Sequence, residues 1–300
     1  MKRLSLDILW YKGIALLLLA LMPLALKAQA FDDDYSKRII CYLADESLAG
    51  RAPATEGSRM AREFIVAEME RAGLQVELQG DEYINVIGRL KGLDSTSLII
   101  VGAHYDHHGI RVVKGSSDTI PRIHPGADDN ASGVAALLQL ARAFGKSETP
   151  LKYTVLFCAW DGEERGMKGS YDFAQKRVAN PEEVALYMNF DMVGRTKDPS
   201  NPAVTFAWDG HCDTLVQLCR ECAERIEQPF VVLYDKRMEY GKGGSDYAPF
   251  SALKIPFIAW MEDEMHADYH KPTDTPDKIC WEKLRKTTEL AYLILAEYLY

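Results

Sequence analysis

The segment Ser97–Tyr105 reads SLIIVGAHY, and this nearly unbroken apolar run is typical of a β-strand that is buried on both faces. Two similar runs follow at Tyr153–Trp160 (YTVLFCAW) and Ala185–Val193 (ALYMNFDMV). Helical spacing of apolar residues predicts amphipathic helices around these strands, including Glu56–Ala72 and Ala131–Phe144. The alternation predicts an α/β fold, with a central mixed, largely parallel, twisted sheet sandwiched between helices.

Further elements are expected on both sides of this centre. The predicted strands are Tyr83–Leu90, Val204–Trp208, Phe230–Tyr234 and Ile255–Met261, and the predicted helices are Gly166–Ala179, about Asp213–Glu227, and Trp281–Tyr298. Gly109–Pro125 is expected to be a loop. Residues 31–300 are predicted to form a single domain, because α/β domains of this size are common.

Residues 1–30 have the pattern of a secretory signal peptide. They contain a basic start, an apolar run at 13–26 and the small-x-small sequence Ala28-Gln29-Ala30. A membrane anchor is the alternative, but the run is shorter than the roughly 20 residues needed to span a bilayer, and Pro23 interrupts it. We therefore expect a cleaved leader, an exported protein that is periplasmic or secreted, and no membrane span in the mature chain.

Charge and cysteine content limit the possible partners and cross-links. The whole chain carries a net charge of −9, and removing the leader, with its net +3, leaves −12. A nucleic-acid partner is disfavoured, because phosphate binding requires a basic face. The six cysteines permit disulfides in an exported protein. A structural zinc site at Cys219-x-x-Cys222 would need four ligands, and no matching cysteine pair lies nearby. A disulfide bridge or free thiols are therefore expected there. Cys158 is expected to be a buried free thiol. Oligomeric state is not predicted.

Acidic and imidazole side chains recur in five segments at or near predicted strand ends and turns. The segments are His104-Tyr105-Asp106, Asp128-Asp129-Asn130, Asp161-Gly162-Glu163-Glu164, Asn189-Phe190-Asp191 and Tyr269-His270. In sheets of this kind, binding sites lie at the carboxyl ends of the strands. Divalent metals need clustered oxygen and nitrogen ligands, and the five segments together predict a two-metal hydrolase site.

Each segment also has an ordinary structural interpretation. His104 could be a hydrogen-bonded strand-end residue, and Asp129 could belong to a helix N-cap. Asp191 falls within an apolar predicted strand, where its charge needs either a metal or a salt bridge. The adjacent Glu163 and Glu164 suggest divided roles, one binding metal and the other taking a proton from water. His107 and His108 are expected to be solvated or to lie on the substrate side.

The ordered set of segments, from His104 to Thr275, resembles the co-catalytic di-zinc aminopeptidases, which are related to secreted bacterial leucyl aminopeptidases and to glutamate carboxypeptidase. The resemblance implies a zinc-exopeptidase (phosphorylase/hydrolase-like) fold and two Zn²⁺ ions per chain. It implies a metallo-aminopeptidase that hydrolyses the N-terminal peptide bond through a bridging, metal-activated water. Peptides are the implied substrates, although Mn or Co could replace zinc in a carboxylate-rich site.

The resemblance also implies a role for each site residue. His104 and Asp191 would bind one zinc, Glu164 and His270 would bind the other, and Asp129 would bridge them. Glu163 would be the general base, and Asp106 would lie behind His104. The peptide bond Asp129–Asn130 would be cis, and Tyr247 stands where the family's Ser-Asp-His segment has histidine, after Asp246.

Two other functions remain open from the sequence. A glutaminyl cyclase, a single-zinc acyltransferase that forms pyroglutamate at peptide N-termini, shares the implied fold. A non-catalytic binding domain on the same fold should have lost ligands or the base, and none is missing here. Residue preference and the choice between aminopeptidase and other exopeptidases are not determined by the spacing of the motifs.

Overall fold

The computed structural model describes residues 31–113 and 119–300. The predicted signal peptide at 1–30 lies outside these residues. Within the described part of the chain, no helix combines the length and the apolar character required to cross a bilayer.

Helices and strands alternate along most of the chain. The helices are α2 (Asp33–Leu43), α3 (Glu56–Arg71), α4 (Gly133–Gly145), α5 (Lys168–Arg177), α6 (Asp213–Ala223), α7 (Tyr247–Ala252) and α8 (Trp281–Leu299). Short helical turns are η1 (Glu46–Leu48), η2 (Ala127–Ser132), η3 (Glu163–Arg165), η4 (Pro181–Glu183) and η5 (Pro276–Lys278). The strands are β1 (Gln75–Gln79), β2 (Asn85–Leu90), β3 (Asp94–His104), β4 (Gly109–Arg111), β5 (Arg122–His124), β6 (Tyr153–Trp160), β7 (Val184–Phe190), β8 (Ala203–Asp209), β9 (Val231–Arg237) and β10 (Phe257–Met261).

Eight of the strands in the described residues form one mixed sheet in the order β1-β2-β6-β3-β7-β10-β8-β9. Its four central strands, β6, β3, β7 and β10, run parallel to one another. Antiparallel pairs join β1 to β2, β2 to β6, and β10 to β8. This confirms the predicted mixed, largely parallel sheet, and it gathers the carboxyl ends of four strands at one edge.

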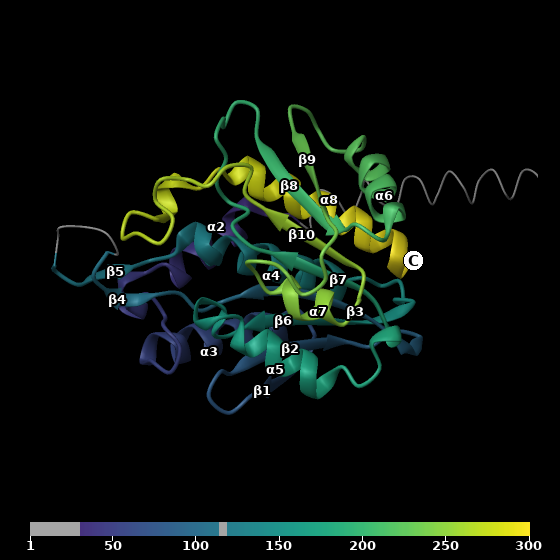
Figure 1. Ribbon diagram of the computed structural model, residues 1–300, viewed down its shortest axis with the longest axis horizontal. Helices are drawn as coiled ribbons and strands as arrows, with labels where there is room; N and C mark the ends of the chain where they lie inside the picture. The colour runs from purple at the N-terminus through teal and green to yellow at the C-terminus, as the bar shows by residue number, and fades with distance from the viewer. Residues whose placement is uncertain (1–30, 114–118) are drawn as a thin grey trace, which may run out of the picture.

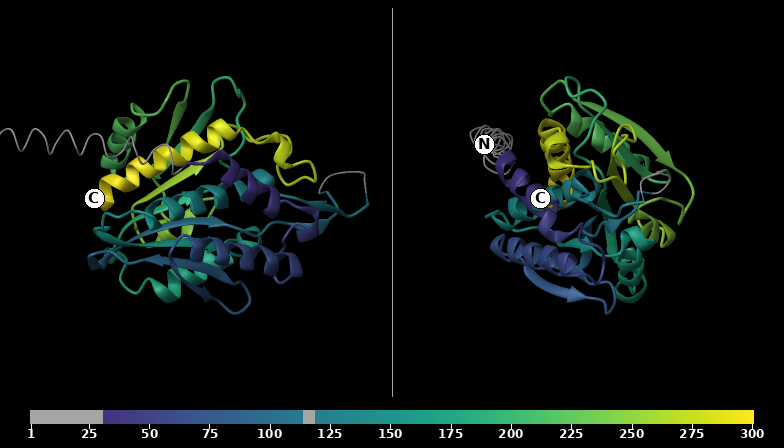
Figure 2. Two further views of the ribbon diagram at one scale, coloured as in Figure 1. Left: turned by 180° about the vertical axis from the view of Figure 1, so that it is seen from behind. Right: turned by 90° about the vertical axis from the view of Figure 1, so that its left-hand side faces the viewer.

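Helices cover both faces of this sheet, which explains the continuous apolar runs of the central strands. In Figure 1, α5 and α7 lie in front of the sheet, and the view from behind in Figure 2 shows α8, α2 and α3 on the other side. Side chains alternate between the two cores along β3. Ile99 and Val101 join the larger core with α4, whereas Ile100 joins the smaller core with Phe173 of α5 and Phe250 of α7.

Local sequence signals account for where several elements begin. The side chain of Thr55 accepts a hydrogen bond from the Ser58 amide and caps α3, and Asp32 caps α2 in the same way. The predicted elements are confirmed with shifts of a few residues at their ends. Sequence patterns missed α2, β1 and α7, and they missed that the expected loop Gly109–Pro125 includes the paired strands β4 and β5.

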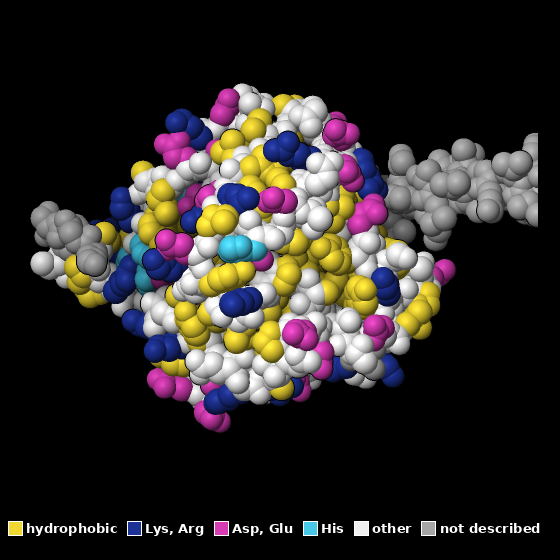
Figure 3. Space-filling view, turned by 45° about the vertical axis from the view of Figure 1, so that its right-hand side comes forward, with side chains coloured by type: hydrophobic (Ala, Val, Ile, Leu, Met, Phe, Trp, Pro, Cys, Tyr) yellow, Lys and Arg dark blue, Asp and Glu magenta, His cyan; other side chains and the backbone are white. Residues whose placement is uncertain are grey.

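The charged side chains are mixed on the surface, and the cysteines are unpaired. On the face drawn in Figure 3, acidic and basic side chains are interspersed and neither sign forms a broad patch. All six cysteines are free thiols in the structure. Cys158 is buried in β6, as predicted, and Cys219 and Cys222 pack into the larger core from α6.

Candidate metal centre

The five predicted metal ligands meet at the carboxyl edge of the four parallel strands. His104 is the last residue of β3, and Asp191 directly follows β7. The prediction that Asp191 lies within a strand is therefore wrong by one residue, because pairing ends at Phe190. Asp129 belongs to η2, the turn that leads into α4, and His270 lies in the loop after β10.

One group of donor atoms forms around the Nε2 atom of His104. This nitrogen lies 3.4 Å from Oδ1 of Asp129 and 3.5 Å from Oδ1 of Asp191. Zinc binds nitrogen and oxygen donors at about 2.0–2.1 Å, so that neighbouring donors of a tetrahedral ion lie about 3.3–3.4 Å apart. The three atoms therefore have the spacing of ligands around one ion, and all three residues are buried.

A second group forms on the other oxygen of the same aspartate. Oδ2 of Asp129 lies 3.2 Å from Nε2 of His270, and that nitrogen lies 3.3 Å from Oε2 of Glu164. Asp129 thus presents one carboxylate oxygen to each group. A carboxylate that bridges two cations would have this geometry, and the bridging role of Asp129 stays a prediction.

Asp106 holds the turn that carries the two glutamates. Its Oδ1 accepts a hydrogen bond from the backbone N–H of Glu163 at 3.0 Å, and its Oδ2 accepts one from that of Glu164 at 3.3 Å. Oδ1 of Asp106 is 3.6 Å from Nδ1 of His104, and its backbone oxygen is closer to that nitrogen, at 3.3 Å. An Nδ1–H directed at Asp106 leaves Nε2 of His104 free to bind an ion.

Buried carboxylates crowd the centre, and their electrostatics favour a bound cation. Burial, reinforced by nearby carboxylates, raises the pKa of Glu163 to about 9 and that of Glu164 to about 11. Burial would also raise the pKa of Asp129, but His107, His104 and His270 around it hold that pKa well below its ordinary value. A bound divalent ion would supply the positive charge that lets such carboxylates ionise in a buried site.

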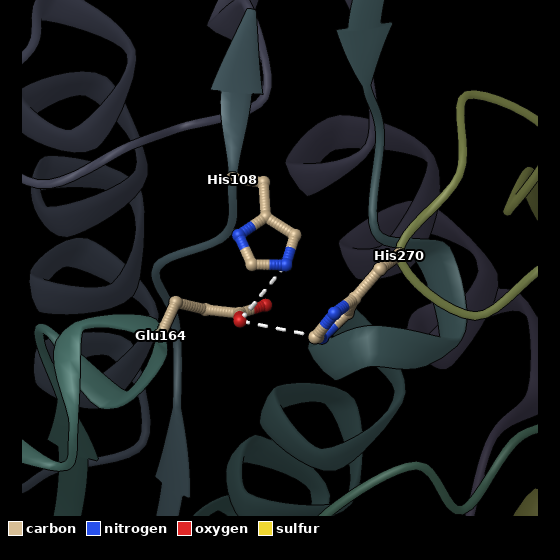
Figure 4. A group of neighbouring side chains, drawn as sticks. All are labelled: His108, Glu164 and His270. Atoms are coloured by element: carbon tan, nitrogen blue, oxygen red, sulfur yellow. Dashed lines mark ion pairs between the residues drawn. The ribbon is translucent and has the colours of Figure 1, made fainter. Parts of the chain in front are cut away.

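Two histidines that the sequence did not assign to the centre also lie in it. His107 and His108 were expected to be solvated or to lie on the substrate side. Solvation is wrong, since His107 is 0% exposed and His108 is 8% exposed. Nδ1 of His107 is 2.7 Å from Oε1 of Glu164. Nε2 of His108 is 3.0 Å from Oε2 of the same residue, a contact drawn in Figure 4. The signal was present in the sequence as three histidines within five residues at a strand end.

Several of these buried polar atoms lack hydrogen-bond partners. Both ring nitrogens of His107, Nε2 of His108 and Oε1 of Glu164 have none among the described residues. Burial lowers the pKa of His107 well below its ordinary value and lowers that of His108 to about 3, with help from neighbouring positive groups. Neutral imidazoles facing carboxylates without hydrogen bonds are a set of donors that fits zinc or a similar divalent ion.

A buried arginine fixes the turn that carries Asp129. The guanidinium of Arg51 is fully buried and donates only to backbone carbonyls. Its acceptors are the carbonyl oxygens of Tyr105 at 2.7 Å, Leu43 at 3.0 Å, Gly126 at 2.7 Å, Asp129 at 3.3 Å, and Pro125. These bonds tie the chain after β3 to the start of η2. No motif in the sequence singled out this residue.

The loop after β10 contributes a second support. The carboxylate of Asp274 accepts hydrogen bonds from the backbone N–H groups of Asp128 and Asp129, each at 3.1 Å. Asp128 itself faces away from the donor groups, with Oδ2 at 3.2 Å from Nε2 of His266 and Oδ1 accepting from the Gly194 amide at 2.6 Å. Of the two histidines in this loop, His270 lies against the donor groups and His266 lies against Asp128.

The turn before Asp129 has the backbone conformation that the centre requires. The peptide bond between Asp129 and Asn130 is cis, as the resemblance implied. Gly126 has a φ of 61°, and a Cβ there would lie 2.2 Å from the Asp129 carbonyl oxygen and 2.6 Å from the His107 ring. Only glycine fits this position, because a side chain would displace both the turn and the imidazole.

The Asp246 segment lies beneath the site. Asp246 is buried and accepts a hydrogen bond from the Ser170 hydroxyl, and burial raises its pKa to about 7. Tyr247, which replaces the family's histidine, is buried and stacks on Phe257 with ring centroids 4.8 Å apart. Tyr247 therefore belongs to the core.

Comparisons with known proteins agree with this geometry. A family model described as "Peptidase family M28" matches residues 85–295. Aminopeptidase YwaD of Bacillus subtilis is 25% identical over 286 residues, covering 88% of this chain and 57% of that protein. The chain thus spans little more than half the length of this curated relative.

Two solved structures share the fold. The zinc aminopeptidase BSAP from Bacillus subtilis superposes with a TM-score of 0.71 at 16% identity, over 90% of this chain and 95% of that one. Glutaminyl cyclase from Porphyromonas gingivalis superposes with a TM-score of 0.72 at 19% identity, over 89% of this chain and 98% of that one. The two likenesses are nearly equal, so the fold by itself does not distinguish a peptidase from a cyclase.

Proposed function

The chain belongs to peptidase family M28, and we propose that it is a zinc-dependent aminopeptidase that hydrolyses the N-terminal peptide bond of peptides. The observation that carries the proposal is the shared carboxylate of Asp129. One of its oxygens lies 3.4 Å from Nε2 of His104 and the other lies 3.2 Å from Nε2 of His270. Such an arrangement suits two zinc ions per chain, held at adjacent positions.

The proposed ligands divide between the two positions. His104, Asp129 and Asp191 would hold the first ion, and Asp129, Glu164 and His270 would hold the second. When bound, the two ions would polarise the peptide carbonyl and lower the pKa of the attacking water.

Glu163 is the proposed general base. It belongs to neither of the two donor groups described above, although its neighbour Glu164 belongs to the second. Its backbone N–H is fixed by Asp106 at 3.0 Å, and its surroundings include His104 and Asp191. Near the bound cations its carboxylate would ionise, accept a proton from the attacking water and pass that proton to the leaving amine.

A glutaminyl cyclase is the alternative that the fold leaves open. It is disfavoured by the completeness of the donor set, because a single-zinc enzyme has no need of five ligands arranged around a shared carboxylate. Membership in a peptidase family and the name of the relative YwaD also favour peptide hydrolysis.

We further propose that residues 31–300 form the catalytic domain and that the protein acts outside the cytoplasm, either in the periplasm or after secretion. The proposal of export is supported by the signal-like pattern of residues 1–30. The proposed partners are peptide substrates.

The test is a paired assay on the zinc-loaded protein. Aminoacyl-p-nitroanilides and short peptides should be hydrolysed with release of the N-terminal amino acid. Treatment with a chelator should abolish this activity, and added Zn²⁺ should restore it. Peptides with N-terminal glutamine are assayed in parallel, and cyclisation of these peptides without release of any amino acid would show that the peptidase proposal is wrong.

A further inference from the structure

His108 lies where a further ligand of the second ion would lie. Its Nε2 atom is 3.0 Å from Oε2 of Glu164, and Nε2 of His270 is 3.3 Å from that same oxygen. Figure 4 shows both imidazoles directed at the glutamate from two different loops. The three donor atoms all lie within 4.8 Å of one another. They therefore surround a common point, as the ligands of one ion do.

The contact between His108 and Glu164 does not have hydrogen-bond geometry. Although the two atoms are 3.0 Å apart, Nε2 of His108 is buried and has no hydrogen-bond partner among the described residues. A buried polar nitrogen without a partner destabilises the folded state. An ion between this nitrogen, Glu164 and His270 would remove that destabilisation, because all three would then direct lone pairs at a positive charge.

His107 is the competing candidate, and its geometry is different. Its Nδ1 lies 2.7 Å from the other carboxylate oxygen of Glu164, Oε1, and 3.8 Å from Oδ2 of Asp129. It therefore does not share the oxygen that His108 and His270 share. The rings of His108 and His270 also meet edge to face, with centroids 4.0 Å apart and an interplanar angle of 85°. This arrangement lets both Nε2 atoms reach one ion without a clash.

We propose that Nε2 of His108 is a further protein ligand of the second zinc ion, beside Asp129, Glu164 and His270. This inference rests on the proposed di-zinc function. It gives the second position four protein ligands, whereas the first has three. Zinc sites with four protein ligands are usually closed, and those with three keep a position for water or substrate. The second ion is then the more tightly held, and the open coordination position lies mainly on the first.

The test measures metal affinity separately from catalysis. Metal-free protein is titrated with Zn²⁺ against a chromophoric chelator, and with Co²⁺ while the visible ligand-field absorption is recorded. The variants are His108→Ala and His108→Gln, the latter keeping a polar side chain in case the alanine variant does not fold. The matched control is His124→Asn. His124 is also buried, its ring is 6.2 Å from that of His108, and it belongs to none of the donor groups.

The wild type should bind two ions with unequal affinities. Replacing His108 should weaken the tighter step by more than about tenfold, since even the loss of a residue behind a ligand costs about 10–100-fold in metal affinity. It should also change the Co²⁺ spectrum, while His124→Asn leaves both unchanged. If the wild type binds two ions, and replacing His108 changes both dissociation constants by less than about twofold, the inference is wrong and the proposed function stands. If the wild type binds fewer than two ions, the proposed di-zinc function fails, and this inference fails with it.

Discussion

Replacing Glu163 with glutamine should lower kcat by about 10²–10⁴-fold, the contribution that a positioned general base makes. This corresponds to about 2.7–5.4 kcal/mol of transition-state stabilisation. The structure supports the size of the effect, because Glu163 is half-buried at the centre and belongs to no donor group. Its backbone is also held independently by Asp106. Glutamine keeps the shape of the side chain, so the loss should appear in kcat with zinc content and KM nearly unchanged.

The adjacent residue provides the matched control. Glu164→Gln makes the same chemical change one position along the turn, but it removes a carboxylate that lies 3.3 Å from Nε2 of His270. This variant should lose zinc affinity as well as activity. The two variants are compared by steady-state kinetics on an aminoacyl-p-nitroanilide and by measuring the zinc content of each after dialysis. Turnover of Glu163→Gln within about tenfold of wild type would refute the assignment of the base.

The same substitution has a second effect in the metal-free protein. Burial raises the pKa of Glu163 from 4.5 to about 9. At any pH between these two values, Glu163 therefore keeps its proton in the folded chain and has lost it in the unfolded chain. Stability of the wild type should then fall with rising pH in this window, by at most about 1.4 kcal/mol per pH unit from this one group. Glu163→Gln removes that dependence. Urea unfolding in the presence of chelator should therefore find the variant at least as stable as wild type at pH 7, and a clear loss of stability would contradict the argument.

Two further predictions concern stability away from the catalytic step. Arg51→Met removes five hydrogen bonds to buried backbone carbonyls, each worth about 1 kcal/mol. The variant no longer buries a charged group, which offsets part of this loss. The free energy of unfolding should therefore fall by about 3–5 kcal/mol. Urea midpoints measured without metal test this, and a cost below about 1 kcal/mol would show that water replaces the guanidinium. Glu68 is 2% exposed and pairs with Arg38 and Arg71, which hold its pKa below the ordinary value against the opposing effect of burial. The ionised carboxylate therefore stabilises the fold fully at a pH above the pKa that Glu68 has in the unfolded chain, and this stabilisation is lost as the pH falls. At pH 7, Glu68→Gln should lower the free energy of unfolding by about 1–2 kcal/mol. The difference from wild type should shrink as the pH falls below 4.5, the ordinary pKa of a glutamate, and through the lower pKa of folded Glu68. Thermal unfolding at pH 7 and at a series of lower pH values measures this, and a constant difference would contradict the reasoning.

The sequence predicted the sheet and its site well where the physical signal was local. Long apolar runs such as Ser97–Tyr105 indicate strands covered on both faces, and β3 and its neighbours follow this pattern. Polar residues placed directly after such runs must gather at one edge when the strands are parallel. His104, Glu164 and Asp191 were therefore predictable as neighbours before their distances were known.

Other features depend on contacts between distant segments, which local patterns do not encode. Arg51 lies in a turn before α3, yet its acceptors come from residues 43, 105, 125, 126 and 129. His108 was misjudged because an imidazole after a strand end is exposed in most contexts, and here the loop that carries His270 covers it. The hairpin of β4 and β5 was missed because each strand has only three residues, too few for an alternating pattern.

The most direct measurement of the central claim is the rate of amino-acid release as Zn²⁺ is added stepwise to the metal-free protein. A di-zinc aminopeptidase predicts that the rate continues to rise until two equivalents per chain are bound. Mass spectrometry of a peptide with N-terminal glutamine, followed in the same titration, should show loss of the glutamine residue. A rate that is complete at one equivalent, or conversion of that peptide to its pyroglutamyl form without cleavage, would contradict the account.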